Sequence, residues 1–240
     1  MYRNNYDPHH RYDPFDSYGQ EARIAGKQRY FAQTYGLMAA GLAVTFLVAF
    51  AVACFFPQVA LSSGTVLILC VLQLVLAFSL GRSLTRGNVS GTLAKFLLYS
   101  AFTGVSFSSV FLFFQAETLT LCFLATAAAF GGMALYGLYG KRDILSWGGT
   151  LVGGLIGLLV LMVLGLFLSV PMLHLFISVL GILVFMGMTA YDTRKLSLMY
   201  DQAAGTQMAQ VYAVYGAFQL YLDFINLFLY LIRLLSLNRD

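Results

Sequence analysis

The sequence predicts an all-α polytopic membrane protein, a bundle of seven transmembrane helices. Of its 240 residues, 60% are apolar and only 10% are charged, and the mean hydropathy is +0.79. An ordinary soluble chain is roughly 45–50% apolar and about 25% charged. The composition therefore excludes a soluble enzyme, a nucleic-acid-binding protein and a disordered regulator. The apolar runs are also too long for the alternating strands of an outer-membrane barrel.

Long gaps between charged residues define the helices. The 52 residues between Arg29 and Arg82 contain no charge, and as one helix they would be roughly 78 Å long, about twice the length of a tilted span. The gap therefore holds two helices, at about 35–56 and 60–81, with Pro57 in the turn between them.

The remaining spans follow in the same way. Two helices are expected at about 92–114 and 118–139. The next charge-free gap, from Ile144 to Tyr191, holds two more, at about 145–168 and 173–191, divided near Pro171, and the last helix covers about 208–235. In the fifth helix, Gly149, Gly153 and Gly157 form two overlapping GxxxG spacings, which predict close packing on a neighbouring helix.

The positive charges alternate between connections, and this predicts the orientation. The N-terminal flank and the second, fourth and sixth connections carry Lys or Arg, and the first, third and fifth carry none. The basic residues are Arg23, Lys27 and Arg29, then Arg82, Arg86 and Lys95, then Lys141 and Arg142, and finally Arg194 and Lys195. Because such residues accumulate on the cytoplasmic side, we expect an odd number of spans and a cytoplasmic N-terminus. Arg233 and Arg239 argue weakly against an outside C-terminus, but a long side chain at a span end can reach the interface.

The first residues differ from the rest in being polar. Residues 1–28 lack apolar periodicity, so we expect a flexible polar N-terminal tail there, and a membrane domain over residues 29–237. The polar start also argues against a cleavable signal peptide.

Two aspartates stand out because ionisable groups inside a bilayer are costly. Asp223 lies in the middle of the last predicted helix, and Asp192 ends the one before it. On antiparallel helices the two could meet inside the bundle. Their predicted depths are roughly 18 and 28 Å from the outer face, so spacing alone does not prove a pair. A packing hydrogen bond for Asp223 and a solvated loop position for Asp192, beside Arg194 and Lys195, remain alternatives.

The segments around these aspartates resemble those of a known family. GILVFMGMTAYDTRKL at 181–196 and LYLDFINLFLYLIRLL at 220–235 are similar to the two signature stretches of the Bax inhibitor-1 family. Supporting stretches are RYFAQTYGLMAAGL at 29–42, LLYSAFTGVSFSSVF at 97–111 and LYGLYGKRDILSWGG at 135–149. The likeness covers roughly residues 28–237, and the short loops look like those of bacterial members.

The resemblance implies a function and a site. It implies a central seventh helix and a pH-sensitive calcium leak controlled by two aspartates, which fall on Asp192 and Asp223. These would sense protons, line the ion path and bind calcium weakly and transiently. In the family, a basic residue at the inner end of the second helix can latch one aspartate. The position aligned with it in this chain is Gly81, so Arg82, one residue later, is the candidate latch. No cofactor is implied, because calcium is the permeant ion, and the expected location is a bacterial inner membrane.

Three functions remain open at this stage. The first is the proton-controlled leak, since two close carboxylates in a low-dielectric site share a proton. The second is a non-conducting regulator of a membrane protease or a cell-death pathway, since family members are linked to both. The third is an intramembrane aspartyl protease, which Tyr191-Asp192 and Asp223 match in outline, although the glycines expected before the second aspartate are replaced by Leu220-Tyr221-Leu222. We expect no enzyme.

Overall fold

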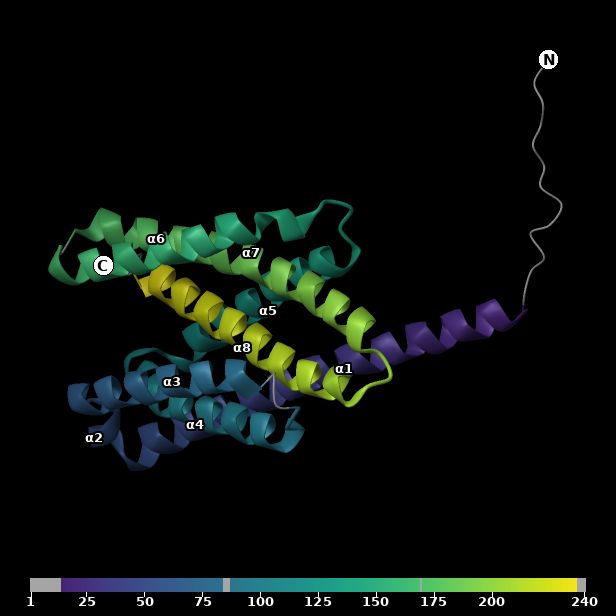
Figure 1. Cartoon of the computed structure of the whole chain (residues 1–240). Helices are drawn as coiled ribbons and strands as arrows, with labels where there is room; N and C mark the ends of the chain where they lie inside the picture. The colour runs from purple at the N-terminus through teal and green to yellow at the C-terminus, as the bar shows by residue number, and fades with distance from the viewer. Residues whose placement is uncertain (1–13, 84–86, 169, 237–240) are drawn as a thin grey trace, which may run out of the picture.

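The computed structural model describes residues 14–83, 87–168 and 170–236, and this part of the chain is helical apart from its connections (Figure 1). The helices are α1 (Pro14–Phe55), α2 (Pro57–Ala60), α3 (Ser63–Ser83), α4 (Val89–Phe113), α5 (Ala116–Tyr139), the 3-10 helix η2 (Ile144–Trp147), α6 (Gly148–Phe167), α7 (Pro171–Ala203) and α8 (Gln207–Ser236). Within the described residues, six helices are long and apolar enough to cross a membrane, and α3 contributes a shorter apolar stretch, Leu67–Arg82. The chain is an all-α, multi-pass integral membrane protein.

Most helix boundaries agree with the sequence prediction. The helices α3, α4, α5, α6 and α8 begin and end within three residues of the expected positions. Prolines mark two of the expected divisions, because proline is tolerated in the first turn of a helix and not in its interior: Pro57 begins α2 and Pro171 begins α7. Asn88 caps α4, since its side chain accepts a hydrogen bond from the Gly91 amide at 2.9 Å.

The first difference from the prediction is the start of α1. This helix begins at Pro14, so residues 14–28 are helical where a flexible tail was expected. The polar composition predicts a tail, but this stretch belongs to a helix whose later turns bury Tyr30, Thr34 and Met38 at a spacing of four residues. Residues 1–13 of the expected tail lie outside the described residues.

The second difference is the end of α7, which continues twelve residues beyond the expected end at 191. Asp192, Arg194 and Lys195 therefore lie within a helix and not in a loop. The physical reason is an apolar stripe at helical spacing, since Leu196, Tyr200 and Ala203 are all buried. The charged residues mark the end of the apolar stretch, but the helix continues past them and remains packed on the bundle.

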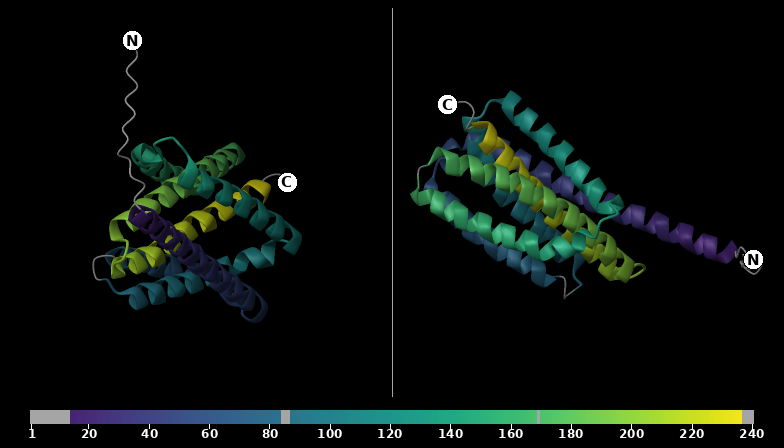
Figure 2. Two further views of the ribbon diagram at one scale, coloured as in Figure 1. Left: turned by 90° about the vertical axis from the view of Figure 1, so that its right-hand side faces the viewer. Right: turned by 90° about the horizontal axis from the view of Figure 1, so that it is seen from above.

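The last helix occupies the interior of the bundle. It packs against α1, α4, α5 and α7, and Figures 1 and 2 show it running between the α6–α7 pair and the α3–α4 pair. Of the six candidate spans it has the largest buried share. Polar and aromatic contacts hold it there: the Tyr221 hydroxyl lies 2.7 Å from the Thr45 hydroxyl of α1, and the Tyr221 ring lies 5.4 Å from that of Phe96 in α4.

Close helix approaches occur at glycines other than those predicted. A Cβ atom at Gly137 of α5 would lie 2.4 Å from the carbonyl oxygen of Ala190 in α7. A Cβ at Gly149, Gly153 or Gly157 would meet nothing within 4 Å. The prediction that the GxxxG spacing marks a packing face is therefore wrong for this chain, because α6 turns these glycines away from the bundle.

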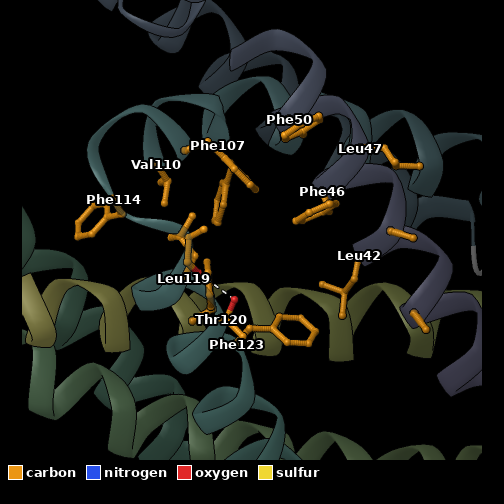
Figure 3. A pocket seen from close by; sticks show the side chains of 15 residues that line it. Leu42, Phe46, Leu47, Phe50, Phe107, Val110, Phe114, Leu119, Thr120 and Phe123 are labelled. Atoms are coloured by element: carbon orange, nitrogen blue, oxygen red, sulfur yellow. Dashed lines mark hydrogen bonds between the residues drawn. The ribbon is translucent and has the colours of Figure 1, made fainter. Parts of the chain in front are cut away.

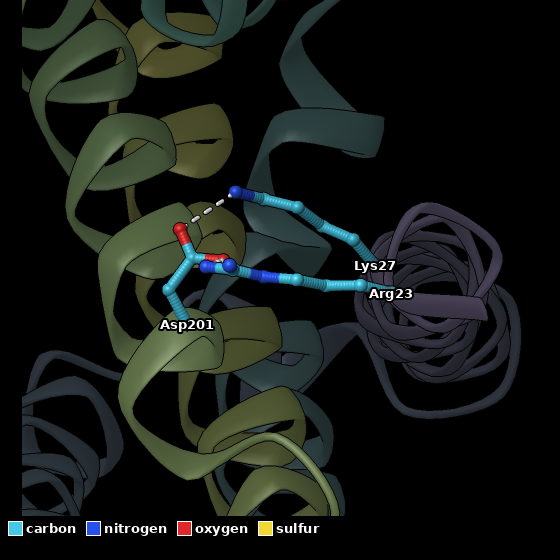
Figure 4. Close-up of polar contacts among 3 residues, drawn as sticks. All are labelled: Arg23, Lys27 and Asp201. Carbon is cyan, nitrogen blue, oxygen red and sulfur yellow. Dashed lines mark hydrogen bonds and ion pairs between the residues drawn. The ribbon is translucent and has the colours of Figure 1, made fainter. Parts of the chain in front are cut away.

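One end of the bundle is held by charges (Figure 4). The Asp201 carboxylate, near the end of α7, accepts hydrogen bonds from Lys27 Nζ at 2.9 Å and from Arg23 Nη2 at 3.3 Å. The Asp201 side chain is 26% exposed, so the pairs contribute at most about 1 kcal/mol. They attach the N-terminal half of α1 to α7, and Figure 1 shows α1 extending beyond the other helices at this end.

Removing this carboxylate is expected to release the start of α1. In Asp201→Asn, both ion pairs are lost, and trypsin should cleave after Lys27 several times faster than in the unmodified protein because that turn opens more often. The measurement is limited proteolysis of the purified protein followed by mass spectrometry. Glu21→Gln removes an exposed charge from the same region of α1 and should leave the rate unchanged. Equal rates in Asp201→Asn and the unmodified protein would show that the ion pairs do not hold this segment.

Candidate functional site

The two predicted aspartates are buried in the interface between α7 and α8. Asp192 lies 11 residues before the end of α7, and Asp223 lies near the middle of α8. Each is only 3% exposed. The alternative of a solvated loop position for Asp192 is therefore wrong. Burial of both carboxylates is an unusual arrangement, since Asp is almost never fully buried without a partner.

Local packing explains why α7 and α8 bring the two residues together. The helices are joined by a short connection, residues 204–206, in which Gly205 has a φ of +79° and allows the sharp turn. Gly216 of α8 approaches Leu196 of α7 so closely that a Cβ would lie 2.4 Å from the leucine side chain. On the other side of α7, the contact of Gly137 with Ala190 presses α5 against the turn that precedes Asp192.

Further titratable groups lie near the pair. The charge of Asp192 acts on Asp223, and Lys195 and Tyr215 are the further titratable groups that interact with Asp192. Lys195 follows Asp192 on α7, and Tyr215 lies on α8 two turns before Asp223. The Oδ2 atom of Asp223 is buried and has no hydrogen-bond partner in the described part of the protein. One Asp223 oxygen is therefore left for water or an ion.

Other unpaired polar atoms lie in the same region. Among the described residues, five buried side-chain oxygens make no hydrogen bond: Tyr30 Oη, Tyr35 Oη, Thr193 Oγ1, Gln219 Oε1 and Asp223 Oδ2. All five belong to α1, α7 and α8. The Tyr35 hydroxyl lies near that of Thr193, which follows Asp192, and Gln219 lies one helical turn before Asp223. Since buried polar atoms are normally paired with protein or water, this cluster is suited to hold water.

One of the unpaired oxygens, that of Tyr30, lies toward the charged end of the bundle. Tyr30 packs against Tyr200, with ring centroids 5.0 Å apart, and Tyr200 precedes Asp201. The unpaired oxygens thus extend from the level of Asp201 inward to Asp223. Sequence reasoning missed Tyr35, Thr193 and Gln219. For Thr193 and Gln219 the only available signal was their position one residue or one turn from an aspartate, and Tyr35, on α1, carried no such signal.

The proposed latch residue lies on a different helix from the residues of this cluster. Arg82 is exposed at the C-terminal end of α3, a helix that packs mainly against α4. A contact between Arg82 and one of the aspartates remains a prediction.

The site offers few ligands for a metal ion. No group of three or more His, Cys, Asp or Glu side chains that could hold a metal occurs among the described residues. Calcium prefers 6–8 oxygen ligands, so two carboxylates with nearby hydroxyl and amide oxygens would bind it only weakly. This arrangement suits an ion that passes through better than an ion that is stored.

The chain is a multi-pass helical bundle, and it buries one aspartate on each of its last two helices. These features place it in the class of membrane proteins that have ionisable groups in the core. The family model described as "Inhibitor of apoptosis-promoting Bax1" matches residues 27–240. The chain belongs to this family, the Bax inhibitor-1 family, which confirms the resemblance seen in the sequence.

The relatives include bacterial proteins of nearly the same length. The chain is 38% identical over 220 residues to the inner membrane protein YbhL of Escherichia coli strain K12, an alignment that covers 90% of this chain and 94% of YbhL. It is 36% identical to the uncharacterized protein RP147 of Rickettsia prowazekii, covering 90% of this chain and 92% of RP147. It is also 35% identical to the uncharacterized protein YrjE of Lactococcus lactis, covering 92% of this chain and 97% of YrjE. The chain is thus a bacterial, YbhL-like type of member.

Proposed function

We propose that this protein is a pH-sensitive calcium leak, gated by protonation of Asp192 and Asp223. The observation that carries the proposal is the burial of both carboxylates, each 3% exposed, on two packed spans. Ionisable residues inside membrane spans commonly mark ion and proton pathways. The unpaired oxygens of Tyr35, Thr193 and Gln219 support a hydrated route to the pair.

The chemistry follows from the cost of buried charge. Two carboxylates in one low-dielectric site cannot both be charged at low cost, so they share a proton and titrate as a unit. A change of protonation alters the repulsion between α7 and α8 and the attraction of the site for a divalent cation. The gate is therefore controlled by the charge of the pair, with Lys195 as the cation beside it.

The proposal includes a topology of seven spans. The 21 residues of α3 extend roughly 31 Å, enough to cross the hydrocarbon core. Seven crossings would put the start of α1 and the end of α8 on opposite sides, and they lie at opposite ends of the bundle in Figure 1. The basic connections then face the cytoplasm. The name of YbhL, an inner membrane protein, supports a bacterial inner membrane as the location, with α8 as the central seventh helix.

The topology predicts which residues can be labelled from each side. In a background with Cys54, Cys70 and Cys122 replaced by serine, single cysteines at Gln58 and Gln115 should react with a membrane-impermeant maleimide in intact cells. Single cysteines at Lys141 and Ala204 should react only after permeabilisation. All four positions are exposed or lie in short connections. Labelling of Ala204→Cys in intact cells would contradict the seven-span topology.

The leak itself is tested by reconstitution. The purified protein is placed in liposomes loaded with a calcium dye, and calcium entry is followed over a range of external pH. We expect entry that depends on pH and is absent from liposomes without protein. Protein that inserts correctly but conducts no calcium at any pH would contradict the leak. Copurification of a membrane protease with such a silent protein would favour the non-conducting regulator.

We propose no enzymatic activity for this protein.

A further inference from the structure

A second feature of the bundle is an apolar pocket far from the charged end (Figure 3). It has a volume of about 850 Å³ and lies between α1, α4 and α5, with one residue contributed by α8. Fifteen residues line it, and all except Thr120 are apolar. The Thr120 hydroxyl donates its hydrogen bond to the Ala116 carbonyl of its own helix, at 2.8 Å. The pocket therefore offers nothing to a polar ligand and suits a hydrocarbon.

The pocket has the depth of one lipid leaflet. Along α1 its lining extends from Ala39 to Phe50, which corresponds to roughly 16 Å of helix. Half of the hydrocarbon core of a bilayer is about 15 Å thick. On α4 and α5 the lining residues adjoin the connection between these helices, residues 114–115. The pocket thus begins at the end of the bundle opposite to Asp201 and ends near the middle of the membrane.

The pocket opens toward lipid. Phe46, Leu47 and Phe50 of α1 line it and are each more than half exposed. At this depth the neighbours of exposed apolar side chains are acyl chains. Figure 3 shows Phe46 and Leu42 facing Phe107, Leu119 and Phe123 across the space.

Two walls of the pocket, those formed by α1 and α5, belong to helices that otherwise touch little. The pair α1 and α5 is absent from the extensive helix contacts of the described chain, so an occupant would bridge these two helices. This distinguishes the pocket from the convex surface of the bundle, where lipids touch one helix face and exchange freely.

The charges at the mouth of the pocket indicate the headgroup. The sequence has no Lys or Arg between Arg29 and Arg82 or between Lys95 and Lys141, so the α1–α2 and α4–α5 connections contain no cation. Glu117, in the first turn of α5, follows the lining residue Ala116. An acid without a neighbouring base in its own connection attracts an ammonium group and repels an anionic headgroup.

We propose that this pocket binds one acyl chain of a phospholipid with an amine headgroup, of the phosphatidylethanolamine type, taken from the leaflet at the α4–α5 connection. The chain fills the space between α1 and α5, and the ammonium group lies near Glu117. The bound lipid stabilises the bundle as a wedge between these helices.

Fluorescence quenching distinguishes this site from ordinary lipid contact. In a Trp147→Phe background, Phe46→Trp places a reporter in the pocket, and Phe78→Trp places one on α3, where Phe78 is 74% exposed and outside the pocket. Both proteins are reconstituted in phosphatidylcholine containing increasing fractions of phosphatidylethanolamine with brominated acyl chains. Bromine quenches tryptophan on contact. The fraction of brominated lipid that gives half-maximal quenching should therefore be several-fold lower for the pocket reporter than for the α3 reporter.

The outcomes of this titration are decisive. Coinciding curves for the two reporters would overturn the site. A pocket reporter that responds equally to brominated phosphatidylglycerol would overturn the assignment of the amine headgroup.

A blocking variant tests the same site by a different measurement. Ala43 lines the pocket, so Ala43→Phe fills part of it, and Ala40→Phe adds the same ring to an exposed neighbouring position outside the lining. In native mass spectrometry, the unmodified protein and Ala40→Phe should retain one phosphatidylethanolamine molecule, and Ala43→Phe should lose it. Equal retention by Ala43→Phe and Ala40→Phe would contradict the proposal. Both measurements are independent of calcium flux, so they can succeed or fail separately from the proposed leak.

Discussion

Asp223→Asn is expected to flatten the pH dependence of calcium entry into liposomes. The substitution keeps the size of the side chain but removes the carboxylate that lies 3% exposed in the middle of α8. A gate that responds to one proton changes its open population by up to about tenfold per pH unit. With an amide at position 223 the pair no longer titrates as a unit, and the ratio between entry at the two ends of the pH range should approach one.

The matched control is Asp143→Asn. Asp143 is an exposed aspartate that caps η2, with its carboxylate accepting a hydrogen bond from the Leu145 amide at 3.2 Å. Asparagine caps a helix about as well as aspartate, so this variant loses one negative charge and keeps the fold. It should retain the normal pH response. If both variants retained that response, Asp223 would have no part in gating.

Gly137→Ala is expected to destabilise the bundle and to impair the leak together. The new methyl group would lie 2.4 Å from the Ala190 carbonyl oxygen, a backbone atom that can move only if α5 and α7 separate. Such overpacking costs about 1–3 kcal/mol, which corresponds to an apparent Tm lower by between about 2 and 12 °C for a chain of this size. Because Ala190 lies half a turn before Asp192, the displacement should also disturb the aspartate pair.

Gly132→Ala provides the control on the same helix. Gly132 is exposed, and a Cβ there meets nothing within 4 Å. Alanine is the better helix former by about 1 kcal/mol, so this variant should be as stable as the unmodified protein or slightly more stable. Thermal unfolding in detergent, followed by tryptophan fluorescence, measures both. A Gly137→Ala protein with an unchanged Tm would show that the approach of α5 to α7 is not rigid.

The hydrophobic pattern predicted most of the fold because the bilayer imposes a length on every apolar run. The charge-free gaps and the prolines at 57 and 171 located α3, α4, α5, α6 and α8 within three residues. The same logic failed at α1 and α7, where helices leave the membrane and continue. Their extensions are stabilised by tertiary contacts, such as those of Lys27 with Asp201 and Tyr30 with Tyr200, which no local pattern reveals.

The candidate site was only partly predictable for a similar reason. Asp192 and Asp223 are visible in the sequence because a carboxylate in a span is rare. Tyr35, Thr193 and Gln219 are ordinary residues whose unpaired oxygens become apparent only when α1, α7 and α8 are packed. The close glycine contacts were misplaced because a GxxxG spacing shows that a helix has a smooth face but not which way that face points.

The most direct test of the central claim is a double-mutant comparison of the two aspartates. Calcium entry is measured against pH for the unmodified protein, Asp192→Asn, Asp223→Asn and the double variant, at equal protein density in the liposomes. If the two carboxylates share one protonation site, each single substitution removes the pH response, and the double variant adds little to either. A normal pH response in Asp192→Asn, with loss only in Asp223→Asn, would contradict the pair and leave Asp223 as a single titrating group.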